Sequence, residues 1–280
     1  LRSFDAPPVR EDNLIARLQE GVYVTTFAGD ASWTQLFGAW ADKTLALPDR
    51  GIHDTTESDE KAEEFLLGWR KVIQPLVPHG HVWVAHFVGS DHVAHRTSAS
   101  GEEYYAKLRE IDARMERIYH AQQPLETDYV LVMADHGATA AGNHGGGEEV
   151  ARRAPFVIAG PGIRPGGPYE TDHRAWAATL ACLLGVEAPD RAERGPAWEF
   201  VMAGPETRAR RNEEVDRKQR AVLGRMGVSP QALGRAASFE EMDALREEAS
   251  GAQPGEVAYA GLAAMALLSL LIAVAFAPSG

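Results

Sequence analysis

Short apolar runs alternate with amphipathic segments over the first two thirds of the chain. Four runs rich in valine, phenylalanine and tyrosine predict buried strands at 22–28, 81–88, 129–134 and 155–160. Apolar residues spaced three and four apart predict helices before, between and after them, at 11–20, 58–76, 101–121 and 172–189. Because strands that alternate with helices are joined by crossover connections, the pattern predicts an α/β fold. Its mostly parallel sheet should be covered by helices on both faces.

The rest of the chain is first charged and then apolar. Residues 201–256 interleave arginine and lysine with glutamate and aspartate, which favours a solvated helical hairpin or stalk. Residues 257–277 form an uncharged apolar run of about 20 residues, the length that crosses a bilayer. A core helix buried on every side is the alternative. We therefore expect three parts: an α/β domain over 1–200, a helical stalk over 201–256 and a transmembrane helix over 257–277.

Charge and cysteine content exclude some functions. The formal net charge of −12 argues against a nucleic-acid-binding surface, which is expected to be basic. The one cysteine, Cys182, lies in an apolar helical pattern, so the chain has neither an intramolecular disulfide nor a cysteine-based metal site.

Five side chains with metal-ligating groups follow two of the predicted strands. One pair comes shortly after the run 81–88, and a second pair comes directly after the run 129–134. Because the carboxyl ends of parallel strands meet at the same edge of a sheet, we expect the two pairs to lie close together. A glycine-rich loop then brings a third histidine back within reach. In chain order the five candidates are Asp91, His95, Asp135, His136 and His144.

Two carboxylates and three imidazoles suit a divalent metal ion. This donor set fits Zn²⁺ well, with Mn²⁺ as the alternative. Without a cation the grouping would be costly, since neighbouring carboxylates repel and partly desolvated ones need compensation. A polar turn with a surface histidine would explain Asp135 and His136 taken alone. It does not explain three such segments in this order.

Other polar residues near the strands are expected to have structural roles. His81 and His86 belong to a predicted strand, and His92 is expected to point away from its neighbouring candidate ligands. Asp30 follows a predicted strand and could cap the helix that contains Trp33. A substrate-binding role for Asp30 is the alternative.

The segments "HFVGSDHVAH", "MADHG" and "GNHGGG" resemble the metal-binding segments of the alkaline phosphatase superfamily. Within that superfamily they are most similar to the catalytic domain of the GPI-anchor ethanolamine phosphate transferases. The block at 11–37 and the segment "ATLACLLGVEAP" are also similar to that family, so the resemblance covers about residues 10–200. It implies that 1–200 is the carboxyl-terminal part of an alkaline-phosphatase-like catalytic domain.

The resemblance implies two metal ions. Asp91, His95 and His144 would bind one ion, and Asp135 and His136 would bind the other. The family completes its second metal site with a further aspartate and uses a threonine or serine nucleophile. Both come before the block at 11–37, so we expect them upstream of Leu1 and expect this fragment alone to be inactive.

The implied activity is metal-dependent transfer of phosphoethanolamine from phosphatidylethanolamine to a mannose of the GPI-anchor glycan. One alternative is a phosphodiesterase or phosphatase that passes the group to water. Another is a catalytically incomplete homologue that serves as a membrane subunit. The expected partners are the phospholipid, the lipid-linked glycan, the membrane and other membrane subunits, with no nucleic acid. The expected location is the endoplasmic reticulum membrane, with the catalytic domain in the lumen.

Overall fold

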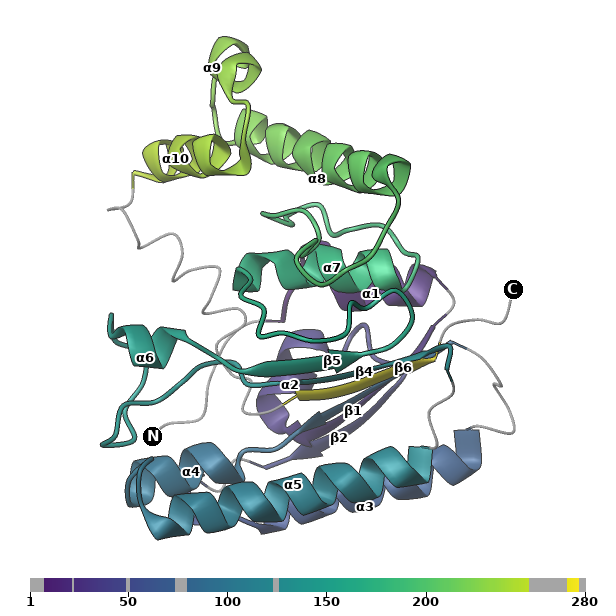
Figure 1. Cartoon of the computed structure of the whole chain (residues 1–280), viewed down its shortest axis with the longest axis vertical. Helices are drawn as coiled ribbons and strands as arrows, with labels where there is room; N and C mark the ends of the chain where they lie inside the picture. Colours follow the sequence, from purple (N-terminus) through teal and green to yellow (C-terminus); the bar gives the residue numbers. More distant parts are fainter. Residues whose placement is uncertain are drawn as a thin grey trace. The chain divides into compact units, whose positions relative to one another are not determined.

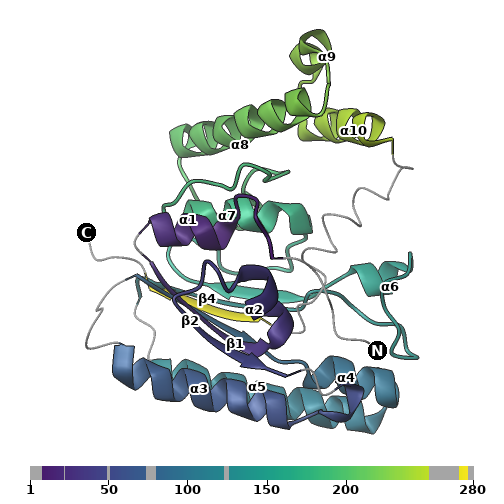
Figure 2. The same cartoon turned by 180° about the vertical axis from the view of Figure 1, so that it is seen from behind.

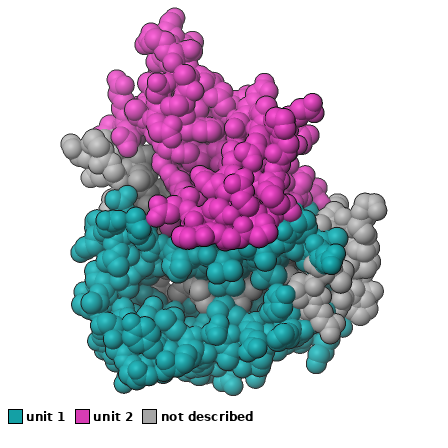
Figure 3. All heavy atoms as spheres, in the orientation of Figure 1, with its two compact units in different colours: residues 1–9, 22–161, 265–280 teal, residues 10–21, 162–264 magenta. Residues whose placement is uncertain are grey.

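The computed structural model describes residues 8–21, 23–48, 51–73, 80–122, 126–251 and 271–276. The chain divides into two units, which Figure 3 shows in different colours. Unit 1 comprises residues 1–9, 22–161 and 265–280, and unit 2 comprises residues 10–21 and 162–264.

Unit 1 is built on a six-stranded sheet with the order β2-β1-β3-β6-β4-β5. The strands are β1 (Val24–Asp30), β2 (Lys43–Leu47), β3 (His81–His86), β4 (Asp128–Met133), β5 (Phe156–Ala159) and β6 (Leu271–Phe276). β1 pairs in parallel with β2 and with β3. β6 runs antiparallel to β3 and to β4, so β3 and β4 share one direction. The predicted α/β class is confirmed, whereas β5 is antiparallel to β4 at the edge of the sheet.

Two long helices cover one face of this sheet (Figure 1). They are α3 (Glu57–Ile73) and α5 (Glu102–Gln122), and the short helix α4 (Gly89–Arg96) lies on the same side. Figure 2 shows α2 (Ala31–Phe37) across the sheet from α3 and α5. Where the structure describes unit 1, the remaining short helices are η1 (Gly51–His53) and α6 (Glu149–Arg152).

The core of unit 1 lies between the sheet and the helix pair α3 and α5. Trp83 and Ala85 of β3 pack there with apolar residues of both helices. On α5, apolar residues recur at helical spacing; Ile111 and Ile118 are buried, but Tyr105 and Leu108, which fall in the same phase, are exposed. The buried face of α5 instead includes Lys107 and Arg114, which are 5% and 7% exposed. Burial of two cations at helical spacing shows that this face also carries an ionic cluster.

The predicted helix over 257–277 differs from the structure at its end, because residues 271–276 form β6. Residues 257–270 and 277 lie outside the described residues. "LIAVAF" is apolar at every position, and a strand paired on both sides has the same composition as a membrane helix, so periodicity cannot separate the two. Among the described helices, none combines the length and apolar composition that a bilayer crossing needs.

Unit 2 is mainly helical. Its helices among the described residues are α1 (Leu14–Glu20), η2 (His173–Ala175), α7 (Trp176–Leu183), α8 (Pro205–Arg225), α9 (Pro230–Arg235) and α10 (Phe239–Ser250). Leu223, Ala236 and Met242 form a small apolar cluster that joins α8 to α10. The charged segment is therefore helical, as its composition predicts, and α8 and α10 contact each other.

Candidate metal centre

The sheet register places the ends of β3 and β4 at the same level. His86, the last residue of β3, and Met133, the last residue of β4, both lie opposite Leu271 of β6. α4 begins three residues after β3 ends, and the residues that follow β4 lead directly into Asp135. The chain segments that carry the candidate ligands therefore leave the same edge of the sheet, on either side of β6, which is the arrangement expected at the carboxyl edge.

On α4, Asp91 and His95 are one turn apart and point to the same side. The distance between Asp91 Oδ1 and His95 Nε2 is 3.4 Å. A spacing of four residues places two side chains one above the other on a helix, so α4 presents both ligating groups together.

The glycine-rich loop is seated directly on α4. Gly142 is buried with a φ of 81°, and a Cβ at this position would lie 1.9 Å from the carbonyl oxygen of Ala94. Ser98 and Ala99 both donate hydrogen bonds to the carbonyl oxygen of Ala140, at 2.7 and 3.2 Å. These contacts are possible only because position 142 lacks a side chain. They bring His144 to the ligating side of α4.

Three ligating atoms converge closely at this point. His144 Nε2 lies 3.3 Å from Asp91 Oδ1 and 2.8 Å from His95 Nε2. A tetrahedral zinc ion with bonds of about 2.0–2.1 Å separates its ligand atoms by roughly 3.3 Å. Both distances to Asp91 fit that value, and the contact between the two imidazoles is shorter. This donor set of one carboxylate and two imidazoles therefore fits a bound Zn²⁺.

Asp135 and His136 lie beside this group. The distance from His136 Nε2 to Asp135 Oδ2 is 3.3 Å, and Asp135 Oδ1 accepts a hydrogen bond of 2.8 Å from the backbone of His136. The rings of His136 and His144 stack with their centroids 3.8 Å apart. The five candidates thus form one connected group.

The described residues allow two ways of grouping the ligands. Atoms of Asp91, His136 and His144 all lie within 4.8 Å of one another, so His136 can replace His95 in a set of three. We favour Asp91, His95 and His144 as one set because their separations are shorter. Asp135 and His136 then remain as candidate ligands that this set does not use.

The charge states of these groups suit cation binding. Burial alone would raise the pKa of Asp91, but the hydrogen bond from His144 and the charges of the three histidines hold it below the ordinary value. Burial, together with the charge of His144, lowers the pKa of His136. An ionised carboxylate and a neutral imidazole are the forms that bind a metal. The hydrogen bond to Asp91 raises the pKa of His144, so metal binding there competes with a proton.

The nucleophile and the further aspartate that the family resemblance places upstream of Leu1 stay predictions. Leu1 itself, with residues 2–7, lies outside the described residues, which begin at residue 8. The five candidate ligands are therefore the part of the predicted site that can be compared with the structure.

The residues expected to be structural lie as follows. His81 and His86 are buried in β3, and burial lowers the pKa of His86 to about 4, which leaves the ring neutral. His92 Nδ1 contacts the carbonyl oxygen of Asp54 at 2.6 Å, so this ring is held by backbone. Asp30 ends β1 immediately before α2, and the ring of Trp33 in α2 stacks on Phe27 with centroids 5.1 Å apart.

One residue of the site region was not identified from the sequence. Asp59 of α3 is 0% exposed and accepts hydrogen bonds from the backbone where α4 begins. The sequence pattern that could have identified it is its position along the helix. Asp59 comes three residues before the buried Ala62 and seven before the buried Leu66, so it lies on the apolar face of α3.

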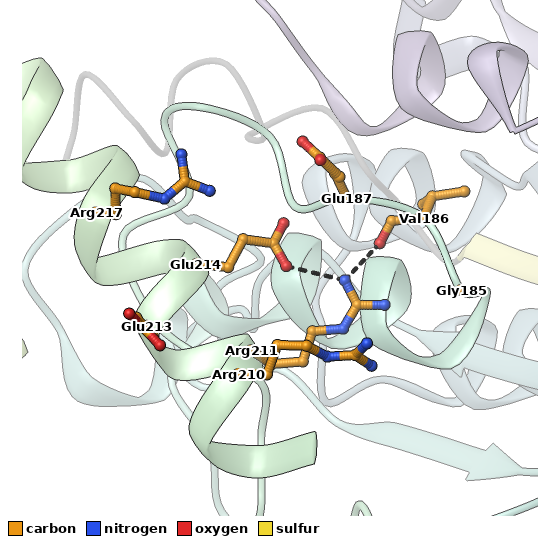
Figure 4. A pocket seen from close by; sticks show the side chains of 8 residues that line it. All are labelled: Gly185, Val186, Glu187, Arg210, Arg211, Glu213, Glu214 and Arg217. Atoms are coloured by element: carbon orange, nitrogen blue, oxygen red, sulfur yellow. Dashed lines mark hydrogen bonds and ion pairs between the residues drawn. The ribbon is translucent and has the colours of Figure 1, made fainter. Parts of the chain in front are cut away.

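Unit 2 contains a separate cavity of about 530 Å³. Figure 4 shows that its charged side chains come from α8 and the 185–187 loop, and that Arg211 donates to Glu214 and to the carbonyl oxygen of Val186. Glu214 also accepts a hydrogen bond from the backbone of Ala188, at 2.7 Å. The hydrogen bonds of Arg211 and Glu214 fix α8 to this loop. None of the candidate metal ligands lines the cavity.

The sheet edge and its donor set together define an α/β domain suited to divalent metal ions. Comparison with known proteins gives the same class: residues 53–188, which contain all five candidates, match the sequence model of the metalloenzyme superfamily. Residues 53–188 are therefore similar to the metalloenzyme superfamily, and the chain is similar to several GPI ethanolamine phosphate transferases.

The catalytic subunit of human GPI ethanolamine phosphate transferase 3 is 31% identical over 195 residues. The human type 2 catalytic subunit is 24% identical over 201 residues. These alignments cover 67% and 68% of the chain, but only 17% and 20% of the human proteins. GPI ethanolamine phosphate transferase 3 of Schizosaccharomyces pombe is 27% identical over 51% of the chain and 15% of the yeast protein. The chain thus spans about a fifth or less of these relatives.

Proposed function

We propose that this chain is part of an enzyme that transfers phosphoethanolamine from phosphatidylethanolamine to a mannose of the GPI-anchor glycan. The observation that carries the proposal is the convergence of Asp91, His95 and His144, with Asp135 and His136 beside them. The names of the similar proteins support the choice of phosphoethanolamine as the transferred group and of the GPI anchor as the acceptor.

The reaction exchanges one phosphoester for another. The bond between phosphorus and the diacylglycerol oxygen breaks, a bond to the mannose oxygen forms, and the mannose hydroxyl proton ends on the diacylglycerol oxygen. Two divalent ions bound here, which we propose to be Zn²⁺, would neutralise the charge of the phosphoryl oxygens. Asp91 and His144 hold one end of the site through their mutual contact. We further propose that a threonine or serine upstream of Leu1 supplies the nucleophile.

The proposed setting is the membrane of the endoplasmic reticulum, with this domain in the lumen and the glycan and phospholipid as lipid-linked substrates. The names of the relatives support it through their connection with GPI anchors. Further membrane subunits are proposed partners.

A transfer assay on the full-length protein tests the function. Membranes that contain it receive phosphatidylethanolamine labelled in its headgroup, with a GPI-mannose acceptor, and label on the glycan is measured. We expect transfer that is lost on chelation and in His144→Ala, and retained in His120→Ala, where the altered histidine is exposed and far along α5. Label released only as water-soluble phosphoethanolamine would identify a hydrolase and contradict the transferase.

A further inference from the structure

The amino end of α4, the helix of Asp91 and His95, is capped from another helix. Asp59 of α3 accepts hydrogen bonds through Oδ1 from the backbone N–H groups of Val88, at 2.9 Å, and Gly89, at 3.2 Å. Val88 is the N-cap residue of α4 and its own side chain cannot accept a hydrogen bond. A carboxylate at this position also interacts favourably with the helix dipole. Asp59 therefore supplies the cap that the local sequence lacks.

The contact between α3 and α4 leaves no room for a side chain at Gly89. A Cβ there would lie 2.3 Å from Asp59 Oδ2 and 2.5 Å from the carbonyl oxygen of Thr55. Any larger residue would have to push the first turn of α4 away from α3. The position of this turn relative to Asp59 is therefore tightly restricted.

The Asp59 carboxylate is buried at a cost. Asp59 Oδ2 has no hydrogen-bond partner among the described residues, and burial raises the pKa of Asp59 to about 6. The nearby cations Lys107 and Arg114 of α5 act in the opposite direction and favour the ionised form. Lys107 is held by Thr56 Oγ1 at 3.0 Å and Glu110 at 2.6 Å. A buried carboxylate that only packed a core would be expected to give way to an apolar residue.

A second contact joins the same two helices. Asp54 caps α3 by accepting a hydrogen bond from the backbone of Glu57, at 2.9 Å, and another from Ser58 Oγ, at 2.6 Å. Its carbonyl oxygen lies 2.6 Å from His92 Nδ1. His92 lies next to Asp91 on α4. The start of α3 therefore fixes both the position of the amino end of α4 and the rotation of α4 about its own axis.

From these contacts we propose that Asp59 is a positioning residue of the metal centre: by holding the first turn of α4 it fixes Asp91 and His95 at the separation that a metal ion requires. It acts through the hydrogen bonds that it accepts from the backbone of Val88 and Gly89. The inference rests on the proposed metal binding.

The test compares Asp59→Asn with Asp112→Asn in the whole 280-residue chain. Asparagine keeps one acceptor oxygen and the size of the side chain but removes the charge, and Asp112 is an exposed aspartate of α5. Zn²⁺ affinity is measured by titration calorimetry, Co²⁺ coordination by visible absorption, and thermal unfolding in EDTA. We expect Asp59→Asn to weaken Zn²⁺ binding about tenfold and to alter the Co²⁺ spectrum. Tenfold is the lower end of the loss in metal affinity that follows when a group that orients metal ligands is removed. Asp112→Asn should change neither the Zn²⁺ affinity nor the Co²⁺ spectrum.

Gly89→Ala provides a second perturbation of the same contact and should weaken Zn²⁺ binding in the same direction. The positioning role is overturned if Asp59→Asn binds Zn²⁺ as tightly as the wild type. If this variant also unfolds at a lower temperature in EDTA but keeps the wild-type Co²⁺ spectrum, Asp59 contributes to stability alone. His144→Ala separates this result from failure of the metal site. If that variant loses Zn²⁺ while Asp59→Asn does not, only the positioning role fails. If the wild-type chain binds no Zn²⁺, the metal site and the inference fail together.

Discussion

Gly142→Ala should damage the metal centre from a position that carries no ligand. At a φ of 81°, an alanine costs roughly 1–2 kcal/mol relative to glycine. Its Cβ would also lie 1.9 Å from the carbonyl oxygen of Ala94, which cannot rotate away because it belongs to the backbone of α4. Overpacking of this kind adds about 1–3 kcal/mol. We therefore expect a loss of about 2–5 kcal/mol in the free energy of unfolding.

Gly145→Ala is the matched control. Gly145 has a φ of 82° in the same loop, but a Cβ there would meet nothing within 4 Å among the described residues. It should lose only the roughly 1–2 kcal/mol of backbone strain. Urea unfolding of the metal-free chain measures both losses, and calorimetry measures Zn²⁺ affinity. Gly142→Ala should also bind Zn²⁺ at least tenfold more weakly, about 1.4 kcal/mol, because His144 would leave Asp91. Equal losses in the two variants would refute the idea that the loop's contact with α4 places His144.

Four further outcomes are expected. Elemental analysis should find fewer metal ions per chain in His144→Ala than in the wild type, and unchanged content would contradict the assignment of this ligand. Zn²⁺ affinity should rise as the pH rises through the raised pKa of His144, because the metal ion displaces the proton that His144 shares with Asp91. Calorimetry in buffers of different ionisation enthalpy should detect the released proton. In the metal-free chain, protonated His144 should stabilise the fold fully at pH values below the pKa of this histidine in the unfolded chain, about 6.5. This stabilisation should be lost as the pH rises through the higher pKa that His144 has in the folded chain. Glu63→Gln should destabilise the chain by about 1–3 kcal/mol in urea unfolding, because it removes one of the two carboxylates paired with the buried Arg114. Glu64→Gln, which alters an exposed residue, should have little effect.

Sequence patterns were most informative where local periodicity and local chemistry coincide. Four predicted strands appear as β1, β3, β4 and β5 with small shifts at their ends. β2 is not predicted because "KTLAL" is short, begins with lysine and is only partly buried, so its apolar signal is weak. β6 is not predicted for the opposite reason, because an entirely apolar run does not distinguish a central strand from a membrane helix.

The candidate ligands could be predicted individually, but their distances could not. Asp135 and His136 stand out because polar residues end an apolar run, and Asp91 and His95 because they are four positions apart. The 3.3 Å between Asp91 and His144 depends instead on a loop seated on α4, which joins residues far apart in the chain. No local pattern encodes such a distance.

Charged residues in helices are also hard to interpret from the sequence. Acidic and basic residues usually occupy exposed helix faces, so neither Asp59 nor Lys107 stands out among its charged neighbours. Both are buried, at 0% and 5% exposure, and Asp59 meets the backbone at the start of α4. A charge in phase with an apolar stripe should therefore be considered together with the candidate ligands, since its burial must be compensated by a specific partner.

The geometry of this metal centre depends on two backbone contacts that involve no ligand. Gly142 allows the loop of His144 to touch the end of α4, and Gly89 allows Asp59 to cap its beginning. The eight residues of α4 are too few to be a stable helix alone, so these contacts determine whether Asp91 and His95 are held ready or must be ordered when a metal binds. Ordering residues on binding would subtract directly from metal affinity. Loosening either end of α4 should consequently weaken metal binding even when every ligand is intact.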